Sequence, residues 1–107
     1  MATRIFLSES ADGLPIPITA TASVTQTIHT ASTSVDQVFL WASNTTSGAL
    51  LLTIEWGVDT GPIEYDIPAN TTDIVVEGLR ISDSDVIYAF AEASSGVSVT
   101  GHVNRLS

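Results

Sequence analysis

Residues 35–56 read VDQVFLWASNTTSGALLLTIEW, and the pattern of this stretch decides the fold class. Two apolar runs flank the segment NTTSG at 44–48, which contains glycine and residues that favour turns. Side chains alternate between the two faces of a strand, so the runs predict strands over 35–43 and 49–56. The five-residue loop between them predicts a β-hairpin.

Both of these strands carry apolar side chains on two faces. Leu51 falls on the face that Thr53 and Glu55 mark as exposed to solvent. In the preceding strand, Phe39 and Trp41 lie opposite the predicted core face. A third strand, predicted over 85–93, is apolar on two faces as well.

Tyr88 and Phe90 lie opposite the core face of that third strand. A two-layer sandwich of this length hides one face of each strand. The extra side chains therefore either pack beneath loops and the N-terminal segment or form a patch that binds another subunit. Large apolar patches on soluble proteins usually mark such interaction sites.

Further short segments predict strands over 3–8, 63–67, 73–77 and 97–104. The last of these joins 85–93 through Ser94-Ser95-Gly96, which predicts a second hairpin. No window sustains the apolar spacing of an amphipathic helix. About seven or eight strands with frequent turn signals predict an all-β, single-domain antiparallel β-sandwich of jelly-roll or immunoglobulin-like topology.

The segment LPIPITATASVTQTI at 14–28 places apolar residues on one parity, with Gln26 as a polar member. Its two prolines lack the N–H groups that a sheet ladder needs. We therefore expect residues 1–18 to form an N-terminal strand and an extended arm, and residues 19–107 to form the β-sandwich.

Composition limits the partners. The chain has 107 residues and a formal charge of −9, with twelve acidic residues, three arginines and no lysine. This balance argues against nucleic acid, whose phosphates need a basic surface, and against anionic membranes. The apolar run at the N-terminus is too short for a secretory signal, so we expect synthesis in the cytoplasm.

Candidate catalytic and metal-binding residues are few. His29 and His102 each fall on the polar parity of a strand, and no pattern brings them to a shared carboxylate. Asp83 and Asp85 predict a turn rather than a calcium loop, whose other ligands are missing. The two NTT segments predict turns capped by Asn or Thr side chains. We expect no enzyme activity, no catalytic residue, no metal and no cofactor.

The segments SNTTSGALLLTIEWG, IPANTTDIVVEGLRIS and DSDVIYAFAEASSGVSVTGHVNRL follow one another in an order that resembles a recurrent small β-sandwich of tailed bacteriophage virions. The matching motifs are Asn44 to Ser47, Ile67 to Ala69, Leu79 to Ala91 and Val97 to Val103. The resemblance covers about residues 28–106. It departs from the pattern at Ser84, where a glycine usually precedes the aspartate.

This resemblance implies a virion structural protein, above all a capsid decoration or cement protein, with neck, tail and fibre components as alternatives. We expect a symmetric homo-oligomer such as a trimer, bound to the major capsid protein or other virion proteins, in which a second apolar face meets a neighbour. The extended arm would lie across a neighbouring subunit. The predicted interface residues are Leu14, Ile16, Ile18, Phe39, Trp41, Leu51, Tyr88 and Phe90.

Two other functions stay open. A receptor- or carbohydrate-binding tip module would use Trp41, Trp56 or Tyr88 as a stacking platform for a ligand. An enzyme subunit would need His29 or His102 in a pocket beside a carboxylate.

Overall fold

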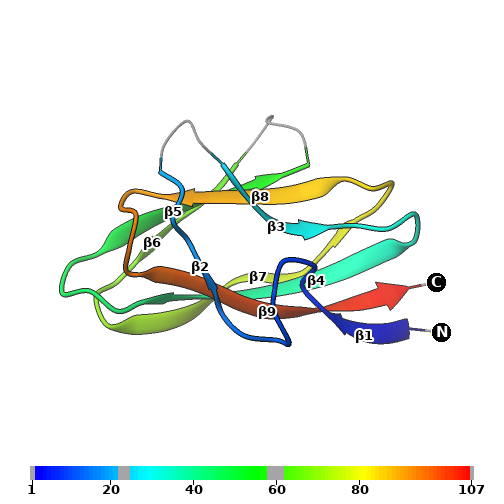
Figure 1. Ribbon diagram of the computed structural model, residues 1–107, viewed down its shortest axis with the longest axis horizontal. Helices are drawn as coiled ribbons and strands as arrows, with labels where there is room; N and C mark the ends of the chain where they lie inside the picture. The colour runs from blue at the N-terminus through cyan, green and yellow to red at the C-terminus, as the bar shows by residue number, and fades with distance from the viewer. Residues whose placement is uncertain (1, 22–24, 58–61, 107) are drawn as a thin grey trace.

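The computed structural model describes residues 2–21, 25–57 and 62–106, which form two antiparallel β-sheets packed face to face (Figure 1). The strands are β1 (Ala2–Phe6), β2 (Ile16–Pro17), β3 (Gln26–Thr30), β4 (Val35–Asn44), β5 (Leu50–Trp56), β6 (Ile63–Ile67), β7 (Thr71–Ile81), β8 (Val86–Ala91) and β9 (Val97–Leu106). We call β1-β9-β4-β7, with β2 also paired to β9, the β9 sheet. The β8 sheet is β3-β8-β5-β6. The prediction of an all-β sandwich is confirmed.

The strand pairs are nested along the chain. β2 pairs with β9, β3 with β8, β4 with β7 and β5 with β6, and successive pairs belong to alternate sheets. This is the arrangement of a jelly roll, in which a long folded hairpin wraps around a core. Of the two topologies that the sequence left open, the jelly roll is therefore the observed one. In the described part of the chain, no helix could cross a membrane.

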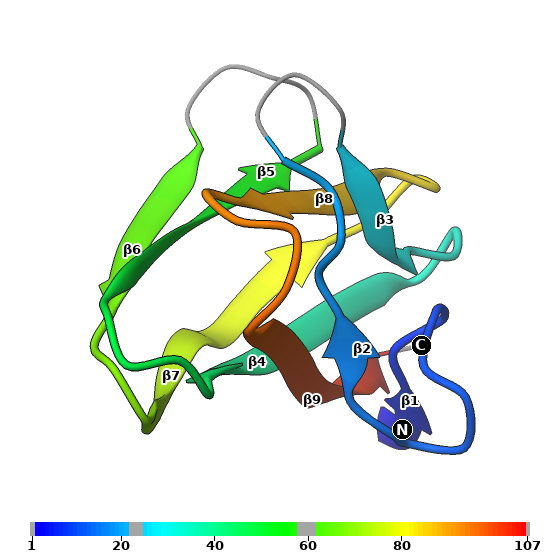
Figure 2. The ribbon, with the colours of Figure 1, turned by 60° about the vertical axis from the view of Figure 1, so that its left-hand side comes forward.

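Both predicted hairpins are wrong. β4 and β5 lie in different sheets, and so do β8 and β9, so each short loop crosses from one sheet to the other (Figure 2). The two crossing loops contact each other, because the Thr45 N–H donates to the carbonyl oxygen of Gly96 at 2.9 Å. A short loop with glycine suits either connection, so the composition of the loop alone does not distinguish a hairpin from a crossing.

Asn44 holds the first crossing loop in place. Its buried amide donates from Nδ2 to the carbonyl oxygens of Gly48 and Ile67, both at 2.9 Å. Its Oδ1 accepts from the N–H and the hydroxyl of Thr46, at 2.9 and 2.7 Å. The prediction that this NTT segment is a turn with a side-chain cap is confirmed.

The Asp-Ser-Asp segment is also a turn, as predicted. The Asp85 N–H donates to the carbonyl oxygen of Ser82 at 3.1 Å. Asp83 and Ser84 both have positive φ angles, 59° and 61°. Glycine adopts this left-handed conformation without the penalty of a side chain, whereas Asp83 and Ser84 adopt it here with one.

The core lies between the sheets and follows the predicted alternation. Val97, Val99 and Val103 of β9 are buried, as are Ile87 and Ala89 of β8. These inward side chains from the two sheets form one cluster. Period-two alternation therefore identified the buried faces of these strands correctly.

The N-terminal segment does not extend away from the sandwich. β1 and β2 both pair with β9, and Ile16 and Ile18 are buried in the core. Figure 2 shows β2 and the chain after it rising from the β9 sheet toward the β8 sheet. The Gln26 side chain fastens this segment, donating to Pro17 O at 2.8 Å and accepting from Thr19 N at 2.9 Å. The one polar residue on that parity thus binds backbone groups of the segment.

Candidate functional site

Aromatic side chains gather on the outer face of the β9 sheet. Phe6 of β1 is paired with His102 of β9, and His102 is paired with Phe39 of β4. The rings of Phe39 and His102 are stacked, with centroids 4.8 Å apart and planes 21° apart. Trp41 lies 5.8 Å from His102 between centroids, and Phe6 is 58% exposed. The rings of Phe39, His102 and Trp41 form a half-buried aromatic platform, and Phe6 lies on the neighbouring strand.

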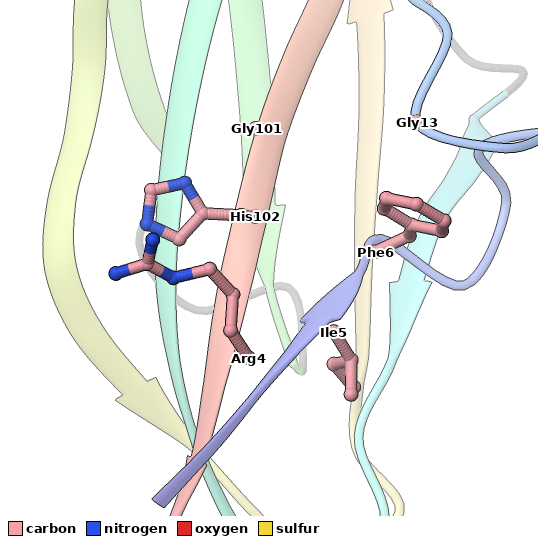
Figure 3. Close-up of a pocket in the computed structure, with 6 residues that line it drawn as sticks. All are labelled: Arg4, Ile5, Phe6, Gly13, Gly101 and His102. Carbon is pink, nitrogen blue, oxygen red and sulfur yellow. The ribbon is translucent and has the colours of Figure 1, made fainter.

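A cavity of about 380 Å³ adjoins this platform. It is lined by Arg4, Ile5, Phe6, Gly13, Gly101 and His102 (Figure 3). Figure 3 shows the Arg4 side chain beside the His102 ring, with Phe6 toward Gly13. Small-molecule sites commonly fall in this range of volume and are mostly apolar with a few polar groups. We call this space the β1–β9 cavity.

The polar wall of the β1–β9 cavity is cationic or neutral. The Arg4 Nε donates to Asn104 Oδ1 at 3.4 Å, and none of the ion pairs among the described residues involves Arg4. Burial, and then the charge of Arg4, lower the pKa of His102 below its usual value. The His102 imidazole therefore takes up a proton at a lower pH than an ordinary histidine does.

The outer face of the β8 sheet carries apolar side chains on its two central strands and acidic side chains on β5 and β6. Leu51 of β5 and Tyr88 and Phe90 of β8 point outward and are half-buried. Thr53, expected to be exposed, is only 4% exposed because it lies between its partners Phe90 and Glu64. The face of β5 that the sequence predicted to be exposed to solvent is thus partly covered by the side chains of its own sheet.

The predicted interface residues do not form one surface. Phe39 and Trp41 lie on the outer face of the β9 sheet, whereas Leu51 lies on the outer face of the β8 sheet. The predicted hairpin would have placed these three residues on one surface, but β4 and β5 lie in different sheets, so they cannot form one joint contact. Tyr88 and Phe90 share the face of Leu51.

The predicted contacts in the N-terminal segment divide in the same way. Leu14 is 61% exposed, but Ile16 and Ile18 are buried in the core of their own subunit. Ile16 and Ile18 are therefore corrected from interface residues to core residues. β2 needs its ladder partner on β9, and burial of these two side chains holds the segment against its own sandwich.

A buried polar cluster joins the two sheets, and the sequence reasoning missed it. His29 Nε2 lies 2.8 Å from Asp36 Oδ2, and the Arg105 guanidinium binds the same carboxylate at 2.8 and 2.9 Å. A register shift between Thr27 and His29 turns the His29 ring inward, against its predicted polar parity. A signal was present, because Asp36 shares its parity with the core residues of β4.

The contacts define the protonation of this cluster. The Ser8 N–H donates to His29 Nδ1 at 3.0 Å, so the proton of the neutral ring is on Nε2 and points at Asp36. Burial alone would raise the pKa of Asp36, but hydrogen bonds from Arg105 and His29 outweigh it and lower that pKa. His29 does lie beside a carboxylate, but both side chains are fully buried and mutually engaged rather than open to a ligand.

The two histidines lie in different sheets and in different environments. His29 points into the core from the β8 sheet, and His102 lies on the outer face of the β9 sheet. Among the described residues, no three side chains of the kinds that bind metals come together. The described residues offer binding surfaces and the β1–β9 cavity, and their buried polar cluster at Asp36 joins the two sheets.

A chain in the structure of infectious bursal disease virus, Gt strain, is similar to this chain with a TM-score of 0.41 and 18% sequence identity. The similarity covers 96% of this chain and 32% of that chain, so this chain spans about a third of its length. No protein-family model matches the sequence, and no curated protein sequence matches it.

Proposed function

We propose that this chain is a structural protein of a virus particle, specifically a capsid decoration or cement protein of a tailed bacteriophage. The observation that carries the proposal is that both sheets present large apolar side chains on their outer faces. Phe6 and Ile74 are 58% and 38% exposed on the β9 sheet. Leu51 and Phe90 are half-buried on the β8 sheet. A sandwich needs only its inner faces to fold, so outer apolar faces favour contacts with other subunits.

The fold and the segment order support this proposal. Jelly rolls serve viral capsid and lectin domains and cupins, so the fold alone does not select one function. The order of motifs over residues 28–106 resembles small sandwiches of phage virions. A virion structural protein functions through contacts with neighbouring subunits, and the outer faces of the two sheets provide surfaces for such contacts.

The mechanism is passive and depends on many copies. Each large apolar side chain that becomes buried contributes about 1.5–3 kcal/mol before the costs of association. Contacts repeated around a particle raise the effective affinity far above that of one contact. The charge of −9 keeps free subunits soluble before assembly.

The direct test is binding to particles of the virus that encodes the chain. Purified protein is mixed with particles that lack it, the particles are pelleted, and the bound copies are counted. We expect saturable binding with a fixed number of copies per particle and a higher temperature of genome release. Absence of binding at saturating concentration would contradict the proposal.

The β1–β9 cavity favours a second candidate, a receptor- or carbohydrate-binding module. Phe6 and the stacked His102 offer apolar and aromatic surfaces, and Arg4 offers a guanidinium beside them. These are the groups that bind a sugar ring bearing a carboxylate. Binding of acidic glycans on an array, abolished by Arg4→Ala, would favour this candidate over the particle protein.

A further inference from the structure

The arginines of this chain all lie in one sheet. Arg4 is in β1, Arg80 in β7 and Arg105 in β9, all strands of the β9 sheet. Arg105 is engaged with the buried Asp36. Arg4 and Arg80 are exposed and are paired with the outward residues Asn104 and Gln37. The outer face of the β9 sheet therefore carries two arginines that no ion pair among the described residues uses.

The outer face of the β8 sheet has the opposite charge. Glu64 and Asp66 of β6 are exposed, and Glu55 of β5 lies beside Tyr88 on the same face. The four strands of this sheet contain no arginine or lysine. Among the outward strand residues of the β9 sheet, Glu77 is the acidic one. One outer face thus has two cations and one anion, and the other has three anions.

From this segregation we infer that copies of the chain stack head to tail, with the outer face of the β9 sheet against the outer face of the β8 sheet of the next copy. The inference deepens the proposed function, on which it rests, by naming the partner of each outer face. A contact between two β8 sheets would bring six carboxylates together. A contact between unlike faces places the arginines opposite carboxylates, which selects this orientation at encounter.

The apolar side chains and the dimensions of the faces agree with such a contact. Each outer face combines apolar side chains with charged ones, as protein interfaces do. The molecule measures 42 × 26 × 21 Å, and in Figure 1 the sheets are its upper and lower layers. Each face thus spans about 42 × 21 Å.

A head-to-tail contact has a consequence for assembly. The two surfaces differ, so the contact is heterologous and cannot produce a closed two-fold dimer. Repetition closes a ring when the rotation between copies allows it and otherwise continues as a stack. A ring would leave the sandwich edges and loops available to other proteins of a particle.

Two double variants test the pairing of unlike faces. Arg4→Glu with Ile74→Glu alters the β9 outer face, and Leu51→Arg with Glu64→Arg alters the β8 outer face. Self-association is measured by light scattering coupled to size exclusion, and folding by circular dichroism. We expect wild-type protein to associate with rising concentration, and each double variant alone to stay monomeric. An equimolar mixture of the two variants should associate. The first variant keeps an unaltered β8 outer face, and the second keeps an unaltered β9 outer face that can bind it.

Several results would overturn the inference. Either double variant associating alone as strongly as wild type would show a contact between like faces. Wild-type protein that stays monomeric at millimolar concentration would show that the faces do not meet. If the Leu51→Arg change unfolds the protein, Asp66→Arg at an exposed position replaces it with the same expected results.

The particle-binding experiment separates this inference from the proposed function. Monomeric wild-type protein that binds particles would overturn head-to-tail stacking and leave the virion role standing. Protein that shows the expected mixing pattern but binds no particle would support the stacking contact and contradict the virion role.

Discussion

His29 Nε2 lies 2.8 Å from Asp36 Oδ2, and this contact joins the two sheets of the sandwich across its core. His29 belongs to β3 of the β8 sheet, and Asp36 belongs to β4 of the β9 sheet. Both side chains are fully buried. Arg105, the cross-strand neighbour of Asp36, supplies a bidentate contact to the same carboxylate. The carboxylate is therefore the centre of a polar link within an apolar core.

We expect Asp36→Asn to lower the free energy of unfolding strongly. The amide cannot accept hydrogen bonds from Arg105 and His29 as the carboxylate does, and it leaves a guanidinium without its counter-charge. Breaking a buried pair costs about 3–5 kcal/mol, and we expect about 3 here because the Arg105 side chain is 31% exposed. Urea unfolding measures the change. The matched control is Asp66→Asn at an exposed position, expected to change stability by less than about 0.5 kcal/mol.

The same carboxylate predicts a loss of stability in acid. Burial raises the pKa of Asp36, but the hydrogen bonds outweigh burial and leave it below the ordinary value of 3.8. A carboxyl whose pKa is lower in the folded state stabilises fully above its unfolded pKa, and this contribution is lost as the pH falls through the folded pKa. The difference in stability between wild type and Asp36→Asn should therefore shrink below about pH 4. A difference that is constant from pH 7 to pH 2 would contradict this assignment.

Gly101 permits a close approach between β9 and β4. A Cβ at this position would overlap the carbonyl oxygen of Phe39, which belongs to the backbone and cannot move aside. We expect Gly101→Ala to destabilise the fold by about 3 kcal/mol, as overpacking does. The control is Gly48→Ala, where a Cβ would meet no atom within 4 Å. Thermal unfolding of the two variants compares them, and equal midpoints would show that β9 can shift away from β4.

The alternation of side chains predicted the strands and their buried faces. Val97, Val99 and Val103 occupy the inner face because the period of two is a local property of extended chain. The pairing of β4 with β7 and β9 is not local. The loop at 45–49 has the composition of a hairpin loop, but it crosses between sheets, because composition does not specify the partner of the strand that follows.

The candidate site was only partly predictable for a related reason. Phe39, Trp41 and Leu51 were recognised as surplus apolar residues from their parity, but parity does not say which sheet a strand joins. The β1–β9 cavity brings together Arg4 and His102, which are nearly a whole chain apart in sequence. The pairing of β1 with β9 brings these two residues together, and no local sequence motif predicts that pairing.

The last prediction concerns the electrostatics of the β1–β9 cavity. Burial and the charge of Arg4, in that order, lower the pKa of His102. We expect Arg4→Gln to raise the pKa of His102, since it removes the positive charge, but to leave it below the usual value because burial persists. A histidine pKa lowered by folding reduces stability as the pH falls below the unfolded value, and this loss should become smaller in Arg4→Gln.

An NMR titration of the His102 ring protons measures this pKa directly, with His29 as a second resonance in the same spectra. Arg80→Gln is the matched control, because it removes an arginine from the same sheet but outside the cavity. It should leave the titration of His102 unchanged. If Arg4→Gln and Arg80→Gln shift the His102 titration equally, the effect reflects net charge rather than the neighbouring guanidinium. In that case the β1–β9 cavity has no specific cationic wall.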